Sequence, residues 1–279
     1  MLLARFDRPL DLPREERVAL LGGKGDGLMR MAGELGLPVP PGFILTTRAC
    51  AVHREEGWAD SLEQALREGI AGLEVASGRR FGAATGRDVD ALFAAAGSPA
   101  PLLVSVRSGA PVSMPGMLDT VLNVGLDDET TTNFACENPR LADACRARLA
   151  DSFATMIGSP PPPDAWSQLR AAIVAVFRSA HSARADAYRR REGLNGDPVT
   201  AVNVQTMVFG NRDPRSATGV FLTRDPATGE SRPYGDVLFE AQGEDVVSGR
   251  RATLSLEELA RRLPDVARSL FEIGRRLEH

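Results

Sequence analysis

The amino-acid sequence predicts an α+β fold, because helical and strand-like patterns occupy partly separate stretches of the chain. Apolar runs alternate with helical spacing over residues 16–110, helices dominate residues 129–195, and from residue 199 three apolar runs are separated by turn signals. We therefore expect three segments: an N-terminal α/β lobe (1–112), a helical subdomain (113–198), and a second lobe with an antiparallel sheet and a C-terminal helix (199–279).

The composition is that of an ordinary globular protein, and it argues against several classes of function. A net charge of −4 disfavours broad binding to nucleic acid or anionic membranes. No apolar run approaches the ~18–20 residues of a membrane span, and the first residues lack the apolar core of a signal peptide. The three cysteines lack metal-ligand spacing, so we expect a reduced, cytoplasmic protein.

The first lobe is expected to begin with a short apolar run, "RVALLGG", which ends in glycines and precedes a helix over residues 24–36. Four apolar residues of that helix fall on one face: Leu28, Met31, Ala32 and Leu35. A proline-rich turn then leads into a strand from Gly42 to Thr46.

The same signals predict the elements that follow. Thr46 or Thr47 is placed to cap a helix that runs toward Gly57. Residues 58–96 show helical spacing, and a second strand is expected over Leu102–Val106. The four consecutive prolines of "GSPPPPDAW" must interrupt the later helices, because proline cannot continue a helix interior.

The runs "TAVNVQTMVFG", "GVFLTRD" and "DVLFEAQG" predict strands of one antiparallel sheet. The chain closes with a helix from Ser255, where "SLEE" forms a capping box with Glu258 at the third helical position. Six apolar residues form the expected buried face of that helix: Leu256, Leu259, Leu263, Val266, Leu270 and Ile273.

Lys24 is the only lysine among 33 basic residues, and it stands between Gly23 and Gly25 in "GGKGDG", next to the predicted helix. Glycines such as Gly22 let backbone N–H groups approach an anion, and the helix dipole adds positive charge there. A lysine ammonium is a compact, mobile charge that suits phosphate oxygens. The spacing is not that of a Walker A loop, and a glycine-rich turn with a solvated lysine accounts for the same residues.

Arg107 supplies a second basic element. It ends the apolar strand "LLVSV" and is followed by Ser-Gly-Ala, a pattern typical of the rim of a site. A salt bridge at a strand end is the alternative interpretation.

A third element lies in "LFEAQGEDVVSG", where Glu240, Gln242, Glu244 and Asp245 cluster after a strand. Such groups suit ribose hydroxyls, or a metal bound through water. An acidic turn explains the same spacing.

Three long segments resemble one family in the right order: "GGKGDGLMRMAGELGLPVPPGFILTTRAC", "VSVRSGAPVSMPGMLDTVLNVGL" and "AVNVQTMVFGNRDPRSATGVFLTRDPATGESRPYGDVLFEAQGEDVVSG". Together they look like the nucleotide-binding part of pyruvate phosphate dikinases. The resemblance implies an ATP-grasp fold, with two α/β lobes that clamp ATP and Mg²⁺. It also implies transfer of phosphoryl groups from Mg-ATP to a histidine on a separate domain, and from there to pyruvate, which gives phosphoenolpyruvate.

The resemblance also assigns roles to residues that match its motifs. Lys24 matches the glycine-loop lysine on the ATP phosphates, and Arg107 matches the arginine of the "SVRSG" motif. Thr223 in "GVFLTR" would lie near the triphosphate. Backbone groups of three hinge residues would meet the adenine: Met207, Val208 and Phe209.

Two further segments are matched more loosely. Glu240, Gln242 and Glu244 fall in the family's ribose-side segment. A mobile loop over the phosphates is expected from four residues: Met114, Pro115, Gly116 and Met117.

The sequence departs from the family pattern at several points. The helical segment after "VLNVGL" is short, and the sequence lacks the later strands with acidic metal ligands, the phosphohistidine domain and the pyruvate-binding barrel. His53 and His181 fall on predicted helices and His279 is terminal, so none fits the family's phosphohistidine. We expect that this chain alone does not complete the reaction.

Three hypotheses therefore stay open. The chain is an ATP-binding, dikinase-type phosphotransferase domain that works with a histidine domain in cis or trans. Alternatively, it is a non-catalytic, degenerate ATP-grasp module for nucleotide sensing or partner binding, in which an exposed sheet edge favours a homodimer. The third hypothesis sets the resemblance aside and treats the chain as a generic α/β phosphate-binding protein.

Overall fold

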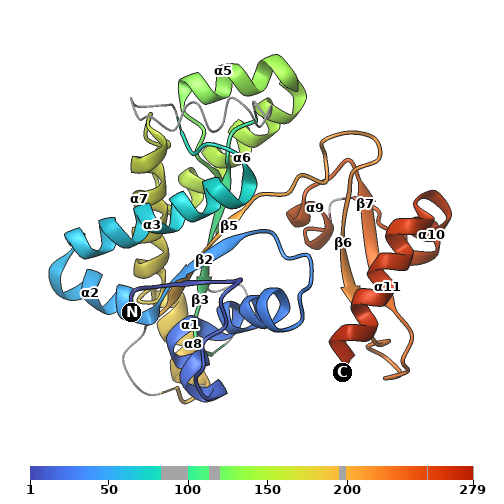
Figure 1. Cartoon of the computed structure of the whole chain (residues 1–279), viewed down its shortest axis with the longest axis horizontal. Helices are drawn as coiled ribbons and strands as arrows, with labels where there is room; N and C mark the ends of the chain where they lie inside the picture. Colours follow the sequence, from blue (N-terminus) through green and yellow to red (C-terminus); the bar gives the residue numbers. More distant parts are fainter. Residues whose placement is uncertain (83–99, 113–119, 195–198, 250, 279) are drawn as a thin grey trace. The chain divides into compact units, whose positions relative to one another are not determined.

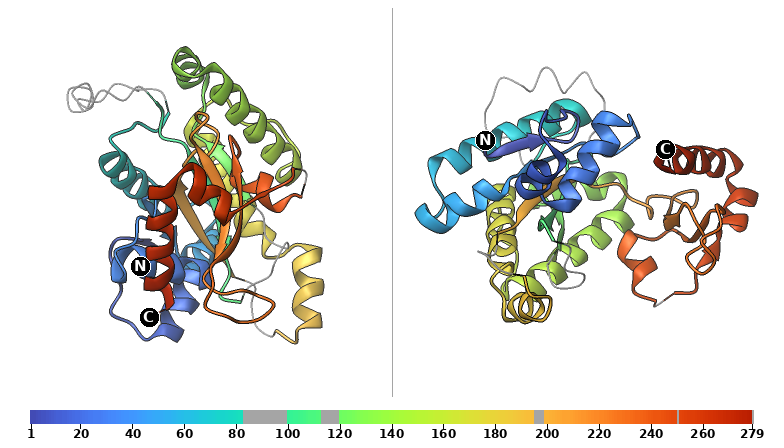
Figure 2. Two further views of the ribbon diagram at one scale, coloured as in Figure 1. Left: turned by 90° about the vertical axis from the view of Figure 1, so that its right-hand side faces the viewer. Right: turned by 90° about the horizontal axis from the view of Figure 1, so that it is seen from below.

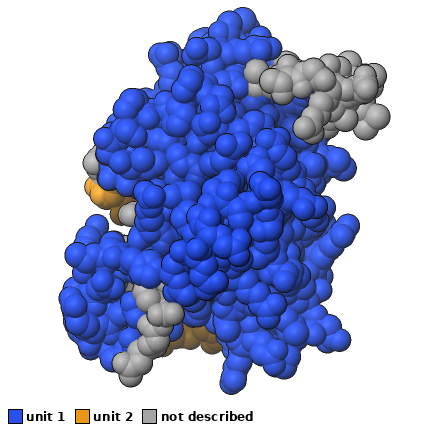
Figure 3. Space-filling view, turned by 90° about the vertical axis from the view of Figure 1, so that its left-hand side faces the viewer, with its two compact units in different colours: residues 1–207 blue, residues 208–279 orange. Residues whose placement is uncertain are grey.

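The computed structural model describes the whole chain except residues 83–99, 113–119, 195–198, 250 and 279. The chain forms two compact units, residues 1–207 and 208–279 (Figure 3). This division differs from the three segments expected from the sequence. The helices after residue 119 belong to the same unit as the N-terminal lobe, and the boundary follows residue 207 instead of residue 198.

The first unit is built on a five-stranded antiparallel sheet with the order β1-β2-β5-β3-β4 (Figure 1). Its strands are β1 (Leu3–Arg5), β2 (Gly42–Leu45), β3 (Val104–Gly109), β4 (Thr120–Val124) and β5 (Ala201–Thr206). The expectation that β5 shares a sheet with the later strands is wrong, because β5 pairs with β2 and β3. Its first four residues are all buried, as suits a central strand covered on both faces.

Helices pack on both faces of this sheet, and glycines let two of them approach closely. A Cβ built on Gly25 of α1 (Arg14–Met29) would lie 3.1 Å from Ile44 Cδ1. A Cβ built on Gly69 of α3 (Asp60–Ser77) would lie 2.7 Å from the Phe43 ring. Since successive side chains of a strand point to opposite faces, α1 and α3 cover opposite sides of β2.

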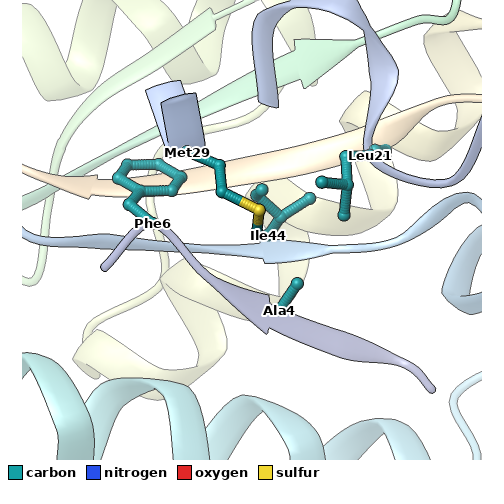
Figure 4. Packing of buried hydrophobic residues seen from close by; sticks show 6 residues of the cluster. Ala4, Phe6, Leu21, Met29 and Ile44 are labelled. Atoms are coloured by element: carbon teal, nitrogen blue, oxygen red, sulfur yellow. The ribbon is translucent and has the colours of Figure 1, made fainter. Parts of the chain in front are cut away.

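One core cluster fixes α1 on its face of the sheet (Figure 4). Its side chains come from β1, α1, β2 and β5, together with Phe6 just after β1: Ala4, Phe6, Leu21, Met29, Ile44 and Ala201. Met29 is 1% exposed and fills the centre of this cluster, although the sequence pattern did not select it. The predicted apolar face is shifted by about one residue from the observed one. Leu28 and Ala32 are only partly buried and pack against the margin of the cluster.

The helices predicted for residues 129–195 are present, whereas the helical segment expected over 58–96 forms a helix only to Ser77, and residues 83–96 lie outside the described residues. Beyond α1 and α3, the helices are α2 (Thr47–Glu56), α5 (Asp128–Glu137), α6 (Pro139–Met156), α7 (Ala165–Ser179) and α8 (Ala183–Arg191). The prolines of residues 160–163 separate α6 from α7, as expected. Neither predicted cap of α2 accepts a backbone hydrogen bond: the hydroxyl of Thr46 donates to Met1 O, and that of Thr47 donates to Ala19 O.

The most informative local feature of the first unit is a break inside α1. The run "RVALLGG" is helical and does not form a strand, and the helix is interrupted at Gly22 (φ 73°, ψ 161°). The chain then resumes helical geometry, so that Lys24 lies in the first turn after the break. A backbone of this kind is accessible almost only to glycine.

The second unit contains a three-stranded antiparallel sheet, β6-β7-β8, and three helices (Figure 1). The elements are β6 (Ala217–Leu222), β7 (Tyr234–Phe239), α9 (Gly243–Val247), β8 (Leu254–Ser255), α10 (Leu256–Arg262) and α11 (Pro264–Glu278). Helices α10 and α11 pack on one face of this sheet (Figure 2), where Val237 meets Leu256 and Leu259.

The predicted C-terminal helix begins where the capping box places it, because Ser255 Oγ accepts a hydrogen bond from Glu258 N at 3.4 Å. It is divided into two helices at Pro264, which starts α11. The change of direction leaves Val266 exposed and buries Ala267 instead.

We predict that Gly22→Ala is strongly destabilising. The added Cβ would stand 1.7 Å from Gly109 O, on a backbone that L side chains rarely adopt. The free energy of unfolding, measured by denaturant titration, should fall by about 3 kcal/mol or more. Gly27→Ala is the matched control: it lies in the same helix, meets nothing within 4 Å, and should gain about 0.5–1 kcal/mol. Equal stabilities for the two variants would contradict this account of the break.

Candidate functional site

The break in α1 lies directly over the end of β3. Gly23 N donates a hydrogen bond to Ala110 O at 3.1 Å, and the Gly22 backbone touches that of Gly109. Gly109 N in turn donates to the buried hydroxyl of Thr200 at 3.3 Å, next to β5. The glycine segment is therefore fixed against two strands of the sheet at the point where β3 ends.

Lys24 projects from this segment and stays exposed to solvent. The surrounding protein reduces the hydration of its ammonium group, and the positive charge of Arg107 adds repulsion, so that both effects lower the pKa of Lys24. The predicted lysine and the predicted arginine therefore lie within electrostatic reach of each other. The structure brings together these two residues, which are separated by 83 positions in the sequence.

Arg107 lies on β3, opposite Thr120 of β4 and Asn203 of β5. Its side chain is half-buried, and burial lowers the pKa of its guanidinium. The Nε atom is buried and has no hydrogen-bond partner. In the described part of the chain, neither Arg107 nor Lys24 forms an ion pair, so a salt bridge at the strand end does not explain Arg107.

Two neighbouring cations without a counter-ion favour the binding of an anion. Arginine offers planar, bidentate donors for phosphate or carboxylate oxygens, and lysine offers a point charge. Both pKa values are shifted in the direction that an anion would reverse, because a negative charge stabilises the protonated forms. The arrangement suits a polyanion that reaches both groups at once.

An ion pair that the sequence pattern did not reveal braces the break in α1. Arg17, before the break, donates from Nε to Asp26 Oδ1 at 2.7 Å, and Asp26, after the break, is 3% exposed. The same guanidinium donates to Leu12 O at 3.3 Å and lies 3.7 Å from Glu34 Oε1. Glycine lowers helix stability, and this ion pair links the two halves of α1 across the break.

Besides the hinge residues, four predicted residues belong to the second unit. Thr223 donates its hydroxyl to Glu278, which also binds Arg224, and Thr223 lines a pocket of about 550 Å³ within this unit. Glu240 is exposed and has a positive φ of 48°. Gln242 is buried, donates from Nε2 to Asn211 Oδ1 at 3.3 Å, and keeps Oε1 without a partner; Glu244 is exposed in α9.

The predicted hinge residues lie at the boundary of the two units. Met207 N donates to Leu103 O at 2.8 Å, so its N–H is occupied within the first unit. Val208 is 69% exposed, and Phe209 is partly buried. The predicted loop of Met114 to Met117 lies outside the described residues.

Of the two histidines predicted on helices, His53 lies on a helix and His181 does not. His53 is on α2, where its ring packs against Phe177 and Trp58, and burial together with the charge of Arg178 lowers its pKa. His181 is exposed between α7 and α8. His279 lies outside the described residues.

The family resemblance implies magnesium, which takes oxygen ligands from carboxylates, water and phosphates. The described residues contain no group of three or more His, Cys, Asp or Glu side chains arranged to hold a metal ion. Mg²⁺ bound with few carboxylates takes its remaining ligands from water and substrate phosphates. The residues seen here do not fit a protein-built magnesium cage, and we derive no chemical step through one.

Asn203 is a second residue near the site that sequence reasoning missed. It is fully buried in the centre of β5, directly opposite Arg107. A signal was present in the sequence: asparagine is rare in a buried strand and interrupts the apolar run "AVNV".

None of the helices described in the structure is long and apolar enough to cross a lipid bilayer.

Comparison with known proteins identifies one family. A family model described as "Pyruvate phosphate dikinase, AMP/ATP-binding domain" matches residues 18–257, which contain both cations and the glycine segment. Pyruvate, phosphate dikinase of Clostridium symbiosum is 37% identical over 311 residues, which cover 93% of this chain and 34% of that protein. The protein of the same name from Rhizobium meliloti (strain 1021) is 39% identical over 292 residues, with coverages of 86% and 31%.

A plant relative gives the same picture. Pyruvate, phosphate dikinase 2 of Zea mays is 38% identical over 308 residues, which cover 93% of this chain and 33% of that protein. The chain thus spans about a third of the length of the curated relatives it matches. The matched stretch in Clostridium symbiosum, 311 positions, is longer than the 279 residues of this chain, so that relative carries additional residues inside the matched region.

Because Lys24 is the only lysine, an amine reagent reports its pKa directly. The reactive free amine should appear at a lower pH than for an ordinary lysine, with a midpoint below 10.5. Competitive acetylation with trace acetic anhydride, read by mass spectrometry of the Lys24 peptide, measures this midpoint. Arg107→Leu removes the repulsion and should move the midpoint upward. A midpoint at or above 10.5, or one that Arg107→Leu leaves unchanged, would contradict the electrostatic coupling.

Proposed function

The chain belongs to the pyruvate phosphate dikinase family, in which it matches the AMP/ATP-binding domain, and on this premise we propose that it binds Mg-ATP with Lys24 and Arg107 on the phosphates. The bound nucleotide would donate phosphoryl groups to a histidine on a separate domain. In the complete reaction these groups would pass on toward phosphoenolpyruvate formation from pyruvate.

One observation carries the proposal: two cationic side chains meet beside a break in a helix, and the described residues give them no counter-ion. A purely structural pair would include an acid, because two like charges held together are destabilising. The triphosphate of ATP supplies several negative charges over a length that reaches both groups. The glycine segment adds backbone N–H groups, and because glycine has no side chain, an anion can approach them closely.

The residues have a clear chemical task in phosphoryl transfer. Charge spreads over the oxygens of the transferring group, and positioned cations stabilise this charge without themselves forming bonds. Lys24, on a flexible stem, would follow the phosphoryl oxygens as they move, whereas the half-buried Arg107 would hold a fixed position. Any Mg²⁺ that ATP carries would neutralise part of the phosphate charge.

The family resemblance assigns further roles in nucleotide recognition. Backbone groups of Met207 to Phe209 would meet the adenine, with the Met207 carbonyl as one candidate because its N–H is already occupied. Gln242 would contribute near the ribose, and its buried Oε1 lacks a partner. Glu240, Glu244 and Thr223 remain candidates by resemblance alone.

Mg-ATP should stabilise the chain, and Lys24 should account for much of its affinity. ATP at about 100 times its Kd adds about 2.7 kcal/mol to the free energy of unfolding, which is visible in a thermal shift. Lys24→Ala should weaken binding by about tenfold to a hundredfold in calorimetric titration, because it removes a charge-assisted contact. Arg146→Ala, which removes an exposed cation on α6, is the control and should bind as tightly as the parent. A Lys24 variant with unchanged affinity would favour the generic phosphate-binding hypothesis.

Transfer is tested separately from binding. The chain is mixed with the isolated histidine domain of a dikinase relative and ATP labelled at the β- or γ-phosphate. Label should appear on the added domain, and Arg107→Met should slow its appearance by on the order of a hundredfold or more. Tight binding of Mg-ATP without any transfer would instead support the non-catalytic, nucleotide-sensing alternative.

A further inference from the structure

Asn203 is a buried amide whose hydrogen-bonding groups are not satisfied. It lies in the middle of β5 with 0% of its surface exposed, and neither Nδ2 nor Oδ1 has a partner. An unpaired buried amide group destabilises the folded state, and most such groups in folded proteins are paired. A polar residue kept at this cost in a central strand calls for an explanation.

The residue opposite Asn203 carries the complementary group. Asn203 and Arg107 are direct partners in the register of β5 and β3, and their side chains project from the same face of the sheet. Directly opposite Cβ atoms lie about 4.5–5.5 Å apart. Arg107 Nε is a buried donor without a partner, and Asn203 Oδ1 is a buried acceptor without one. Because both ends of the amide are unpaired, this match does not depend on which end is the oxygen.

The two glycines that line the site make room for this amide. A Cβ on Gly109 would lie 2.6 Å from Asn203 Nδ2, and a Cβ on Gly25 would lie 3.2 Å from Oδ1. Asn203 thus fills the space between the end of β3 and the segment of α1 that follows the break. From there it can reach Arg107 without meeting solvent.

We propose that Asn203 is a positioning residue for Arg107: its amide oxygen accepts a hydrogen bond from Arg107 Nε when nucleotide is bound. This inference rests on the proposed function. The guanidinium is planar, so that a hydrogen bond at Nε sets the direction in which both terminal nitrogens face the phosphates. Asn203 itself is too deeply buried to touch the nucleotide.

The first test separates positioning from packing. Asn203→Leu removes both polar atoms and keeps the branched shape and the number of heavy atoms, so the melting temperature without nucleotide should stay equal or rise. The Kd for Mg-ATP should nevertheless increase on the order of tenfold, because Arg107 loses its orienting partner. Thr206→Val is the matched control: it removes a buried, unpartnered hydroxyl from the opposite face of the same strand and should leave the Kd unchanged.

A double-mutant cycle shows whether Asn203 acts through Arg107. Arg107→Lys keeps a positive charge but has no Nε donor of this kind, so Asn203→Leu should cost no further affinity in that background. Additive losses would overturn the proposal, because they would mean that Asn203 supports the site by packing alone. An Asn203→Leu variant that binds Mg-ATP as tightly as the parent would overturn it as well.

A measurement on the parent protein avoids any dependence on variant folding. The Nε–H signal of Arg107, assigned by its loss in Arg107→Lys, should shift and exchange more slowly with water when Mg-ATP is added in a ¹⁵N NMR experiment. An unchanged signal in a nucleotide-bound protein would overturn the inference and leave the proposed function standing. A parent chain that binds no Mg-ATP would overturn both.

Discussion

The repulsion between Lys24 and Arg107 is the constraint on which the rest of the site depends. Burial lowers the pKa of both groups, and the charge of Arg107 lowers the pKa of Lys24 further, so the fold has to offset this cost. It does so with backbone contacts that need no charge: Gly22 against Gly109, Gly23 N on Ala110 O, and Gly109 N on Thr200. An anion that binds near both cations would be attracted to each of them. This attraction would offset the repulsion between the two cations.

The glycines of α1 and the ion pair between Arg17 and Asp26 have complementary effects on the helix. Glycine lets α1 approach β3 at Gly22 and leaves room for Asn203 under Gly25, but it also weakens the helix. Arg17 and Asp26 restore the lost rigidity by joining the halves of α1 across the break. Ion pairs of this partly buried kind add little net stability. Breaking one leaves an unpaired charge in the protein interior, so the pair favours a single geometry.

Family membership and the geometry of the first unit agree, although they rest on different observations. The family match spans residues 18–257 and therefore includes both units. The electrostatic argument concerns the first unit alone. In the second unit, Gln242 shows a feature that Asn203 shares, a buried amide with an unpaired oxygen.

Local patterns in the sequence are sufficient to predict the fold class, the helical character of residues 129–191, the cap at Ser255 and the identity of the two cations, because these depend on local periodicity and on unusual residue choices. These patterns do not predict that β5 pairs with β2 and β3 in the first sheet, or that "RVALLGG" is helical. They also do not predict that Met29 belongs to the core. Strand pairing and helix rotation are set by contacts between distant segments, which no local pattern contains. The closeness of Lys24 to Arg107 and of Asn203 to both glycines was decided by the tertiary structure alone, since each pairing joins residues far apart in the chain.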